Sequence, residues 1–172
     1  MKVAAVILCV LTASLLAALL IGALLPKRHE ATRAAVYRRS PGELYAAIRE
    51  FAAMASWRTG LERVELLPPR EGRACFREIS PHQSITYLVL EDRPPERLVT
   101  RIADEALPFG GTWTYEITPG PGGSRLRITE RGEVMNVLFR FMARFVLGYT
   151  GTMNAYLSDL GKKFGEATVP GP

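Results

Sequence analysis

Hydrophobic and polar residues are distributed very differently in the first part of the chain and in the rest. Residues 3–25 contain no charged side chain, and the first acidic residue is Glu30. As a helix this run is roughly 34 Å long, at about 1.5 Å per residue, and covers a hydrocarbon core of about 30 Å. The pattern therefore predicts an N-terminal transmembrane anchor over residues 1–26.

A cleaved signal peptide is the alternative for this segment, because the chain begins with a basic residue, Lys2. The hydrophobic region of a signal peptide has about 7–15 residues, however, and no small-x-small cleavage site precedes Pro26. Both arguments favour an uncleaved anchor. Ser14, Ala18 and Gly22 share one helix face, which suits a close-packed helix dimer, although small residues are also common on lipid-facing helices.

The following residues, 27–167, show the short alternating runs of a sheet-rich domain. Residues 30–38 predict a first strand, and Ser40-Pro41 predicts the start of a short helix that ends near Trp57. Six more strand-length segments follow, separated by turns rich in Pro and Gly: 61–67, 72–79, 84–91, 96–104, 111–118 and 124–131. Such short connections join only antiparallel neighbours, so the sheet is predicted to be a meander.

Residues 137–166 change to a helical period. Apolar side chains recur at intervals of three and four, while Arg140 and Arg144 fall on the opposite face. The segment predicts one amphipathic helix of about eight turns, followed by a disordered tail at 168–172. A second membrane span at its start is disfavoured, because Glu133 and the two arginines interrupt the apolar run.

Together these elements predict an α+β fold in which a curved seven-stranded antiparallel sheet wraps around a long C-terminal helix. That helix is the only element able to cover the apolar face of the sheet. Where a curled sheet and a helix do not touch, an apolar cavity forms that can take a small hydrophobic molecule.

Charge narrows the classes of partner. The chain of 172 residues has a net charge of +5, but its Lys and Arg residues are scattered among acids, which gives nucleic-acid binding little support. The basic residues between positions 27 and 39 suit an anionic membrane face, and their excess over Lys2 favours a cytoplasmic domain. A short basic N-terminus can also stay inside while a domain is exported, so both orientations remain open.

Residues suited to catalysis or metal binding are sparse. His29 lies beside the anchor and His82 in a predicted turn, while Cys75 has no histidine near it in the sequence. Metal-ligand spacings and a phosphate-binding glycine loop are absent from the sequence. The sequence therefore predicts no catalytic residue, no metal and no cofactor.

The order of motifs resembles the START and polyketide cyclase/dehydrase (SRPBCC) superfamily, which has a helix-grip fold. The matching motifs are Ser40-Pro-Gly-Glu-Leu-Tyr45, Trp57, Pro95-Glu-Arg-Leu98, Gly111-Thr-Trp-Thr-Tyr-Glu-Ile117, Gly123-Ser-Arg-Leu126, and a helix through Leu157, Leu160 and Glu166. Arg38 departs from the family pattern, in which this position is commonly apolar. The resemblance implies a cavity for lipids, sterols, polyketides or other apolar ligands, and no particular reaction.

Strand alternation and helical phase predict which side chains line this cavity. The expected ligand-binding residues are Phe76, Tyr87, Trp113, Tyr115, Phe141, Phe145 and Tyr149, with Arg38 at the polar end. Core packing is the alternative role for each aromatic. Arg38, with Glu78, Asp104 or Glu130, is expected to hold the polar head of a ligand. The alternative is that these charges reach water at the rim.

The sequence thus predicts a membrane-anchored domain that binds a hydrophobic small molecule taken up at the membrane surface. Two alternatives remain. In a cyclase or dehydratase, Arg38 and a carboxylate, with Tyr87 or Tyr115, would orient and protonate a polyketide-like substrate. In an interaction module, the protein's own side chains would fill the cavity, and the sheet or helix would dock a protein partner.

Overall fold

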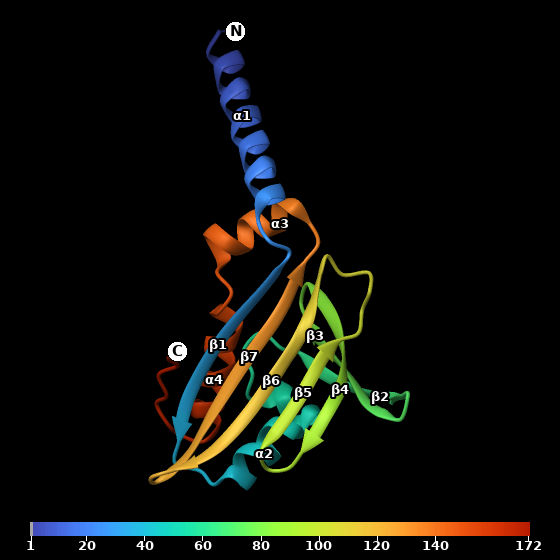
Figure 1. Ribbon diagram of the computed structural model, residues 1–172, viewed down its shortest axis with the longest axis vertical. Coiled ribbons are helices and arrows are strands. Elements are labelled where there is room, and N and C mark those ends of the chain that lie inside the picture. Colours follow the sequence, from blue (N-terminus) through green and yellow to red (C-terminus); the bar gives the residue numbers. More distant parts are fainter. Residues whose placement is uncertain (1) are drawn as a thin grey trace.

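Seven antiparallel strands form a single curved sheet in the computed structural model, which describes residues 2–172 (Figure 1). The strands are β1 (Arg28–Tyr37), β2 (Arg63–Arg70), β3 (Arg73–Ser80), β4 (Gln83–Arg93), β5 (Arg97–Ile102), β6 (Phe109–Gly120) and β7 (Gly123–Val134). Their order is β1-β7-β6-β5-β4-β3-β2, so strands β2 to β7 are a meander and β1 closes the edge beside β7. The predicted fold class and strand pattern are confirmed.

The short helix after β1 begins where the sequence predicts. In α2 (Pro41–Arg49), the Ser40 hydroxyl accepts a hydrogen bond from the Glu43 backbone N–H, and the Glu43 carboxylate accepts one from the Ser40 backbone N–H. This reciprocal pair satisfies two N–H groups that the first helical turn leaves free. A 3-10 helix, η1 (Phe51–Ser56), continues the excursion and buries Phe51 and Met54 in the core.

The N-terminal helix α1 (Lys2–Leu24) extends away from the sheet, and Figure 1 shows its far end free of the rest of the chain. It is the one helix among the described residues that is long and apolar enough to cross a membrane. Gly22 is its one buried residue, where α1 contacts the C-terminal helical region.

The C-terminal helical region is not the single helix that the sequence predicts. It consists of α3 (Val137–Met142), a π-helical turn η2 (Ala143–Leu147) and, after a break, α4 (Gly151–Lys163). The break falls at Gly148, whose φ of 72° lies in the left-handed region that glycine adopts most easily. The first part contacts α1 and the end of β7, while only α4 contributes side chains to the main hydrophobic core.

Helix α4 covers the concave face of the sheet with side chains that are fully or almost fully buried: Met153, Tyr156, Leu157 and Leu160. The Tyr37 hydroxyl of β1 donates a hydrogen bond of 2.8 Å to the Leu157 carbonyl oxygen, which fastens the helix to the sheet. The tail, for which the sequence predicts disorder, follows β1 instead, because Gly171 exchanges two backbone hydrogen bonds with Ala34.

Candidate functional site

A cavity of about 440 Å³ lies between strands β4 to β7 and the break that separates η2 from α4. Its apolar and aromatic wall includes Ile85, Tyr87, Ile102, Phe109, Trp113, Val134, Phe139, Ala143, Leu147 and Tyr149. Its polar side chains are His29, Gln83, Thr100, Glu130, Glu133 and Thr152. Gly148, at the break in the helical region, also lines the cavity.

Three of the predicted ligand-binding residues, Tyr87, Trp113 and Tyr149, line this cavity. Two more lie directly behind them in the core. The Phe76 ring is stacked on Tyr87 with centroids 5.2 Å apart, and the Tyr115 ring lies 6.0 Å from Trp113. Phe76 and Tyr115 are buried by core packing and support the wall.

Phe141 and Phe145 lie outside the cavity wall, contrary to the expected lining. Their rings contact each other at 5.1 Å, and Phe145 is 59% exposed. The expectation assumed one straight helix over the sheet. Phe139, Ala143 and Leu147 line the cavity at intervals of four residues, so Phe141 and Phe145 fall on another face of the same helical region.

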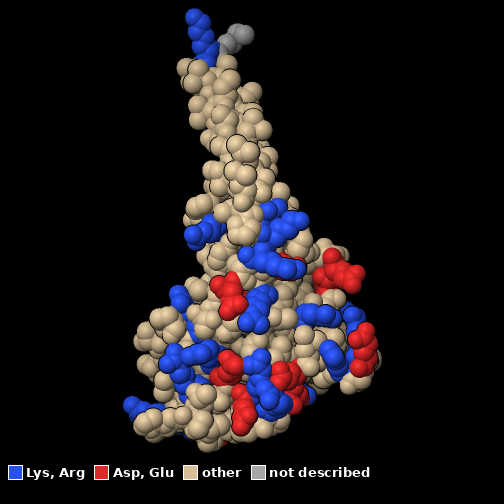
Figure 2. Space-filling view, viewed as in Figure 1, with Lys and Arg blue, Asp and Glu red and all other residues tan. Residues whose placement is uncertain are grey.

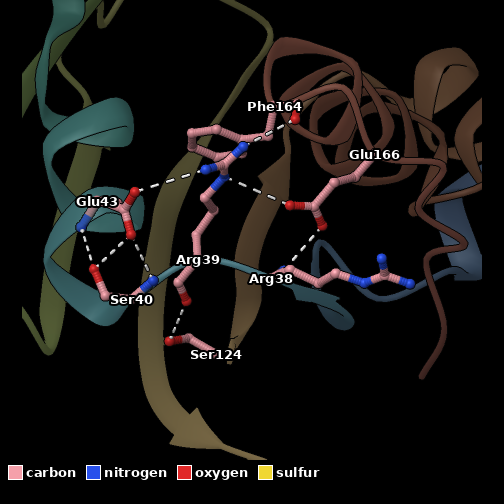
Figure 3. A network of polar contacts seen from close by, with 7 residues as sticks. All are labelled: Arg38, Arg39, Ser40, Glu43, Ser124, Phe164 and Glu166. Carbon is pink, nitrogen blue, oxygen red and sulfur yellow. Dashed lines mark hydrogen bonds and ion pairs between the residues drawn. The ribbon is translucent and has the colours of Figure 1, made fainter. Parts of the chain in front are cut away.

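Arg38 lies away from the cavity, at the end of β1 beside the C-terminal end of α4 (Figure 3). Its side chain is exposed, and its backbone N–H donates to the Glu166 carboxylate at 2.9 Å. The adjacent Arg39 donates to the Phe164 carbonyl oxygen at 3.1 Å and lies 3.5 Å from Glu166. This network fastens the end of the helical region to β1 and α2.

The acids expected to pair with Arg38 have other partners. Glu78 forms an ion pair with Arg58, and the Asp104 carboxylate accepts a hydrogen bond from the Thr86 backbone N–H. The Glu130 carboxylate lies beside the His29 ring. The polar end of the cavity is therefore built without Arg38.

His29 and Glu130 make that polar end. The His29 ring is stacked on Tyr149, with centroids 3.9 Å apart and planes inclined by 21°, and its Nε2 lies 3.4 Å from a Glu130 carboxylate oxygen. Within the described residues, this buried Nε2 has no hydrogen-bond partner. Gly132 makes room for the ring, because a Cβ atom there would lie 2.3 Å from it. A ligand with a polar head can supply the missing hydrogen bond.

The environment shifts the ionisation of Glu130. Burial raises the pKa of its carboxyl group above the usual range, and the neighbouring His29 opposes this rise only in part. The Glu130 carboxyl group therefore holds a proton more readily than an exposed carboxylate would. Such a group can donate as well as accept a hydrogen bond.

A second buried ion pair, Arg58 with Glu78, lies in the core behind Tyr87. The Arg58 guanidinium also lies 5.0 Å from the centre of the Tyr156 ring. Burial, reinforced by the Glu78 charge, raises the pKa of Tyr87 well above its usual value. The Tyr87 hydroxyl therefore remains protonated at neutral pH and is available as a donor in the cavity wall.

Sequence reasoning missed His29 because the first strand was predicted to start at Glu30. Strand β1 starts at Arg28, and its register places His29 opposite Gly132 of β7. A glycine within a strand often marks a place where another group approaches the backbone closely. Gly132 was therefore the signal in the sequence that could have pointed to His29. In the part of the chain that the structure describes, no three His, Cys, Asp or Glu side chains are grouped to hold a metal ion.

Residues 28–164 match the family described as polyketide cyclase/dehydrase and lipid transport. The chain belongs to this family. The resemblance inferred from the motifs is therefore confirmed, and the family match includes both His29 and the C-terminal helical region. Membership indicates binding of a hydrophobic small molecule or a cyclase-type role. No curated protein matches the chain in sequence.

Solved structures share the fold of this family member at low identity. Norcoclaurine synthase from Thalictrum flavum is 10% identical with a TM-score of 0.63, over 81% of this chain and 87% of that one. A START superfamily protein from Mycobacterium smegmatis is 17% identical with a TM-score of 0.57, over 79% and 99%.

The di-domain ARO/CYC protein StfQ, from the steffimycin biosynthetic pathway, is 14% identical with a TM-score of 0.58, over 81% of this chain. The chain spans only 52% of the length of StfQ. At these identities the similarity is one of fold.

Proposed function

We propose that this protein is a membrane-anchored binding protein for a hydrophobic small molecule with one polar, hydrogen-bonding head. The observation that carries the proposal is the cavity of about 440 Å³, which has an aromatic and aliphatic wall and one polar end. Pockets for small molecules commonly have about 300–1,000 Å³ and a few placed polar groups in an apolar wall. In this protein Trp113 and Leu147 belong to the apolar wall, and His29 with Glu130 supplies the polar groups.

The position of the cavity supports a ligand that comes from the membrane. The polar end belongs to the start of β1, only a few residues after the end of α1. An apolar molecule dissolved in the bilayer would reach the cavity without a long passage through water. The excess of Lys and Arg after α1 favours the cytoplasmic side for the domain.

The test is to purify the full chain in detergent, record its native mass spectrum and identify any lipid that is released on denaturation. We expect a copurified species in the wild type. The variant Ala143→Phe fills the cavity from its wall and should lose the copurified species. Ala155→Phe, on the exposed face of α4, should retain that species. Equal melting temperatures would show that both variants fold. Equal ligand occupancy in the two folded variants would contradict the proposal.

A second candidate function is acid–base catalysis on a polyketide-like substrate, as in a cyclase or dehydratase. The observation that favours it is the His29–Glu130 pair in the cavity wall, since a buried acid with a raised pKa beside a histidine can transfer protons. Incubation with a candidate ligand separates the two functions. A binding protein returns the ligand unchanged in mass and in chromatographic retention. A dehydratase returns a product lighter by one water, and a cyclase returns an isomer of equal mass that differs in retention.

A further inference from the structure

A patch of exposed apolar side chains lies next to the anchor helix, in residues 135–147. Among the described residues outside α1, five of the eight exposed large apolar side chains belong to this segment. They are Met135, Leu138, Phe145, Val146 and Leu147. Contiguous exposed apolar surface on a protein commonly marks a site of contact with another molecule or a membrane.

The segment is fixed to the end of α1 by close packing. A Cβ atom on Gly22 would lie only 2.2 Å from the Val137 carbonyl oxygen, so the two backbones touch at this glycine. The buried Arg140 donates to the Leu25 carbonyl oxygen at 2.9 Å and lies 3.5 Å from the Met135 carbonyl oxygen. The helical phase of the sequence put Arg140 on a polar face, but it caps the end of α1 instead.

The geometry of this junction matches the edge of a bilayer. Figure 1 shows α3 running across the lower end of α1, where the apolar helix stops. Figure 2 shows Lys and Arg side chains gathered where α1 meets the domain. Lys27 and Arg28 lie three and four residues after the end of α1, and Arg144 is exposed within the segment itself. Apolar side chains flanked by basic ones are typical of segments that lie at the lipid–water interface.

We infer that residues 135–147 lie in the lipid–water interface, with Phe145, Val146 and Leu147 in contact with the acyl chains. The inference rests on the anchoring of α1 in the proposed function, because α1 sets the depth of the segment. Leu147 lies in the cavity wall as well as in the patch. Lipid therefore reaches the mouth of the cavity directly, and a ligand enters it from the bilayer past Leu147.

The test uses the full chain in nanodiscs of phosphatidylcholine and phosphatidylglycerol, with a nitroxide label on single cysteines. Cys9 is replaced by Ser, and the buried Cys75 stays unlabelled. Labels are placed by Val146→Cys in the patch, Leu16→Cys in α1 and Leu66→Cys on β2. These residues are 62%, 60% and 64% exposed, so the three positions differ in place and not in exposure.

The readout is relaxation of the label by oxygen, which concentrates in lipid, and by a water-soluble nickel chelate. We expect the label at 146 to resemble the label at 16, accessible to oxygen and protected from nickel, and the label at 66 to show the opposite. Nickel access at 146 equal to that at 66 would overturn the inference, because the patch would then lie in water. Such a result would leave the patch as a surface for a protein partner or a second copy of the chain. Nickel access at both 16 and 146 would also overturn the inference.

These outcomes are independent of ligand binding. If the label at 146 is in lipid but no ligand copurifies with the chain, the inference stands and the proposed binding function fails. If a ligand is bound while the label at 146 is in water, the binding function stands and the inference fails.

Discussion

The imidazole ring of His29 is stacked on the phenol ring of Tyr149, with their centres 3.9 Å apart. This contact joins β1, the first strand after α1, to the loop in which the C-terminal helical region breaks. The ring also lies close to the backbone of β7 at Gly132, where a Cβ atom would be only 2.3 Å from it. The imidazole is therefore positioned before any ligand binds, which reduces the entropy that binding costs.

Replacing His29 with Phe should weaken binding of a ligand with a polar head while preserving the stack on Tyr149. We expect roughly a tenfold loss of affinity, which corresponds to one hydrogen bond of about 1.5 kcal/mol. The measurement is a calorimetric titration with the species recovered from the wild type. His82→Phe, at the exposed turn after β3, is the control and should bind normally. Equal affinities for both variants would remove His29 from the site.

Gly132→Ala should give the same binding defect without changing any side chain in the cavity wall. The new methyl group would overlap the His29 ring, which must then move away from Tyr149 and Glu130. Gly120→Ala is the matched control, because a Cβ atom there meets nothing within 4 Å. Tightly retained ligand in Gly132→Ala, measured by the same titration, would show that the position of the ring is unimportant.

The sheet could be predicted from the sequence because its strands and turns are specified by residues that are close together in the chain. Alternation along each strand and the Pro- or Gly-rich turns between them specify both the strands and their antiparallel order. The Trp113 and Tyr115 side chains accordingly lie on the concave side, as their shared phase predicts. The order of the family motifs predicts the same architecture independently.

The site could be predicted only in part because two of its determinants are not local. Phe145 lies outside the cavity because its helical region, which packs on α1 through Val137 and Gly22 and breaks at Gly148, presents Phe139, Ala143 and Leu147 to the cavity instead. His29 enters the cavity because β1 starts earlier than the hydrophobic alternation indicates. In both cases a contact between distant parts of the chain decides the outcome.

Removing one partner of the buried Arg58–Glu78 pair should destabilise the fold. Their side chains are only 15% and 12% exposed, so Arg58→Met leaves a buried carboxylate without its counter-charge. We expect a loss of about 3–5 kcal/mol in the free energy of unfolding. The double variant Arg58→Met with Glu78→Leu should recover most of it, since neither charge remains. Chemical denaturation of all three proteins measures the effect, and a double variant no better than the single one would contradict it.

Asp159 gives stability a defined dependence on pH. Its carboxylate accepts hydrogen bonds from the Thr59 backbone N–H at 2.7 Å and from the Lys162 ammonium at 2.8 Å, which joins α4 to the loop before β2. Burial of Asp159 opposes ionisation, but the bonds from Lys162 and Thr59 outweigh it and hold the pKa of Asp159 below its ordinary value of 3.8. The folded state therefore binds this proton less readily than the unfolded state does.

Stabilisation by the Asp159 carboxylate should accordingly be complete above about pH 4 and disappear as the pH falls through the lowered folded pKa. At pH 7 we expect Asp159→Asn to be less stable by roughly 1–2 kcal/mol, because the amide keeps one acceptor but loses the charge. The gap between wild type and variant should narrow as the pH falls from about 4 through the lowered folded pKa. Lys162→Met, which removes one donor, should lose less stability at pH 7. Unfolding in non-ionic detergent at a series of pH values measures this gap, and a constant gap across the acid range would show that the charge of Asp159 contributes nothing.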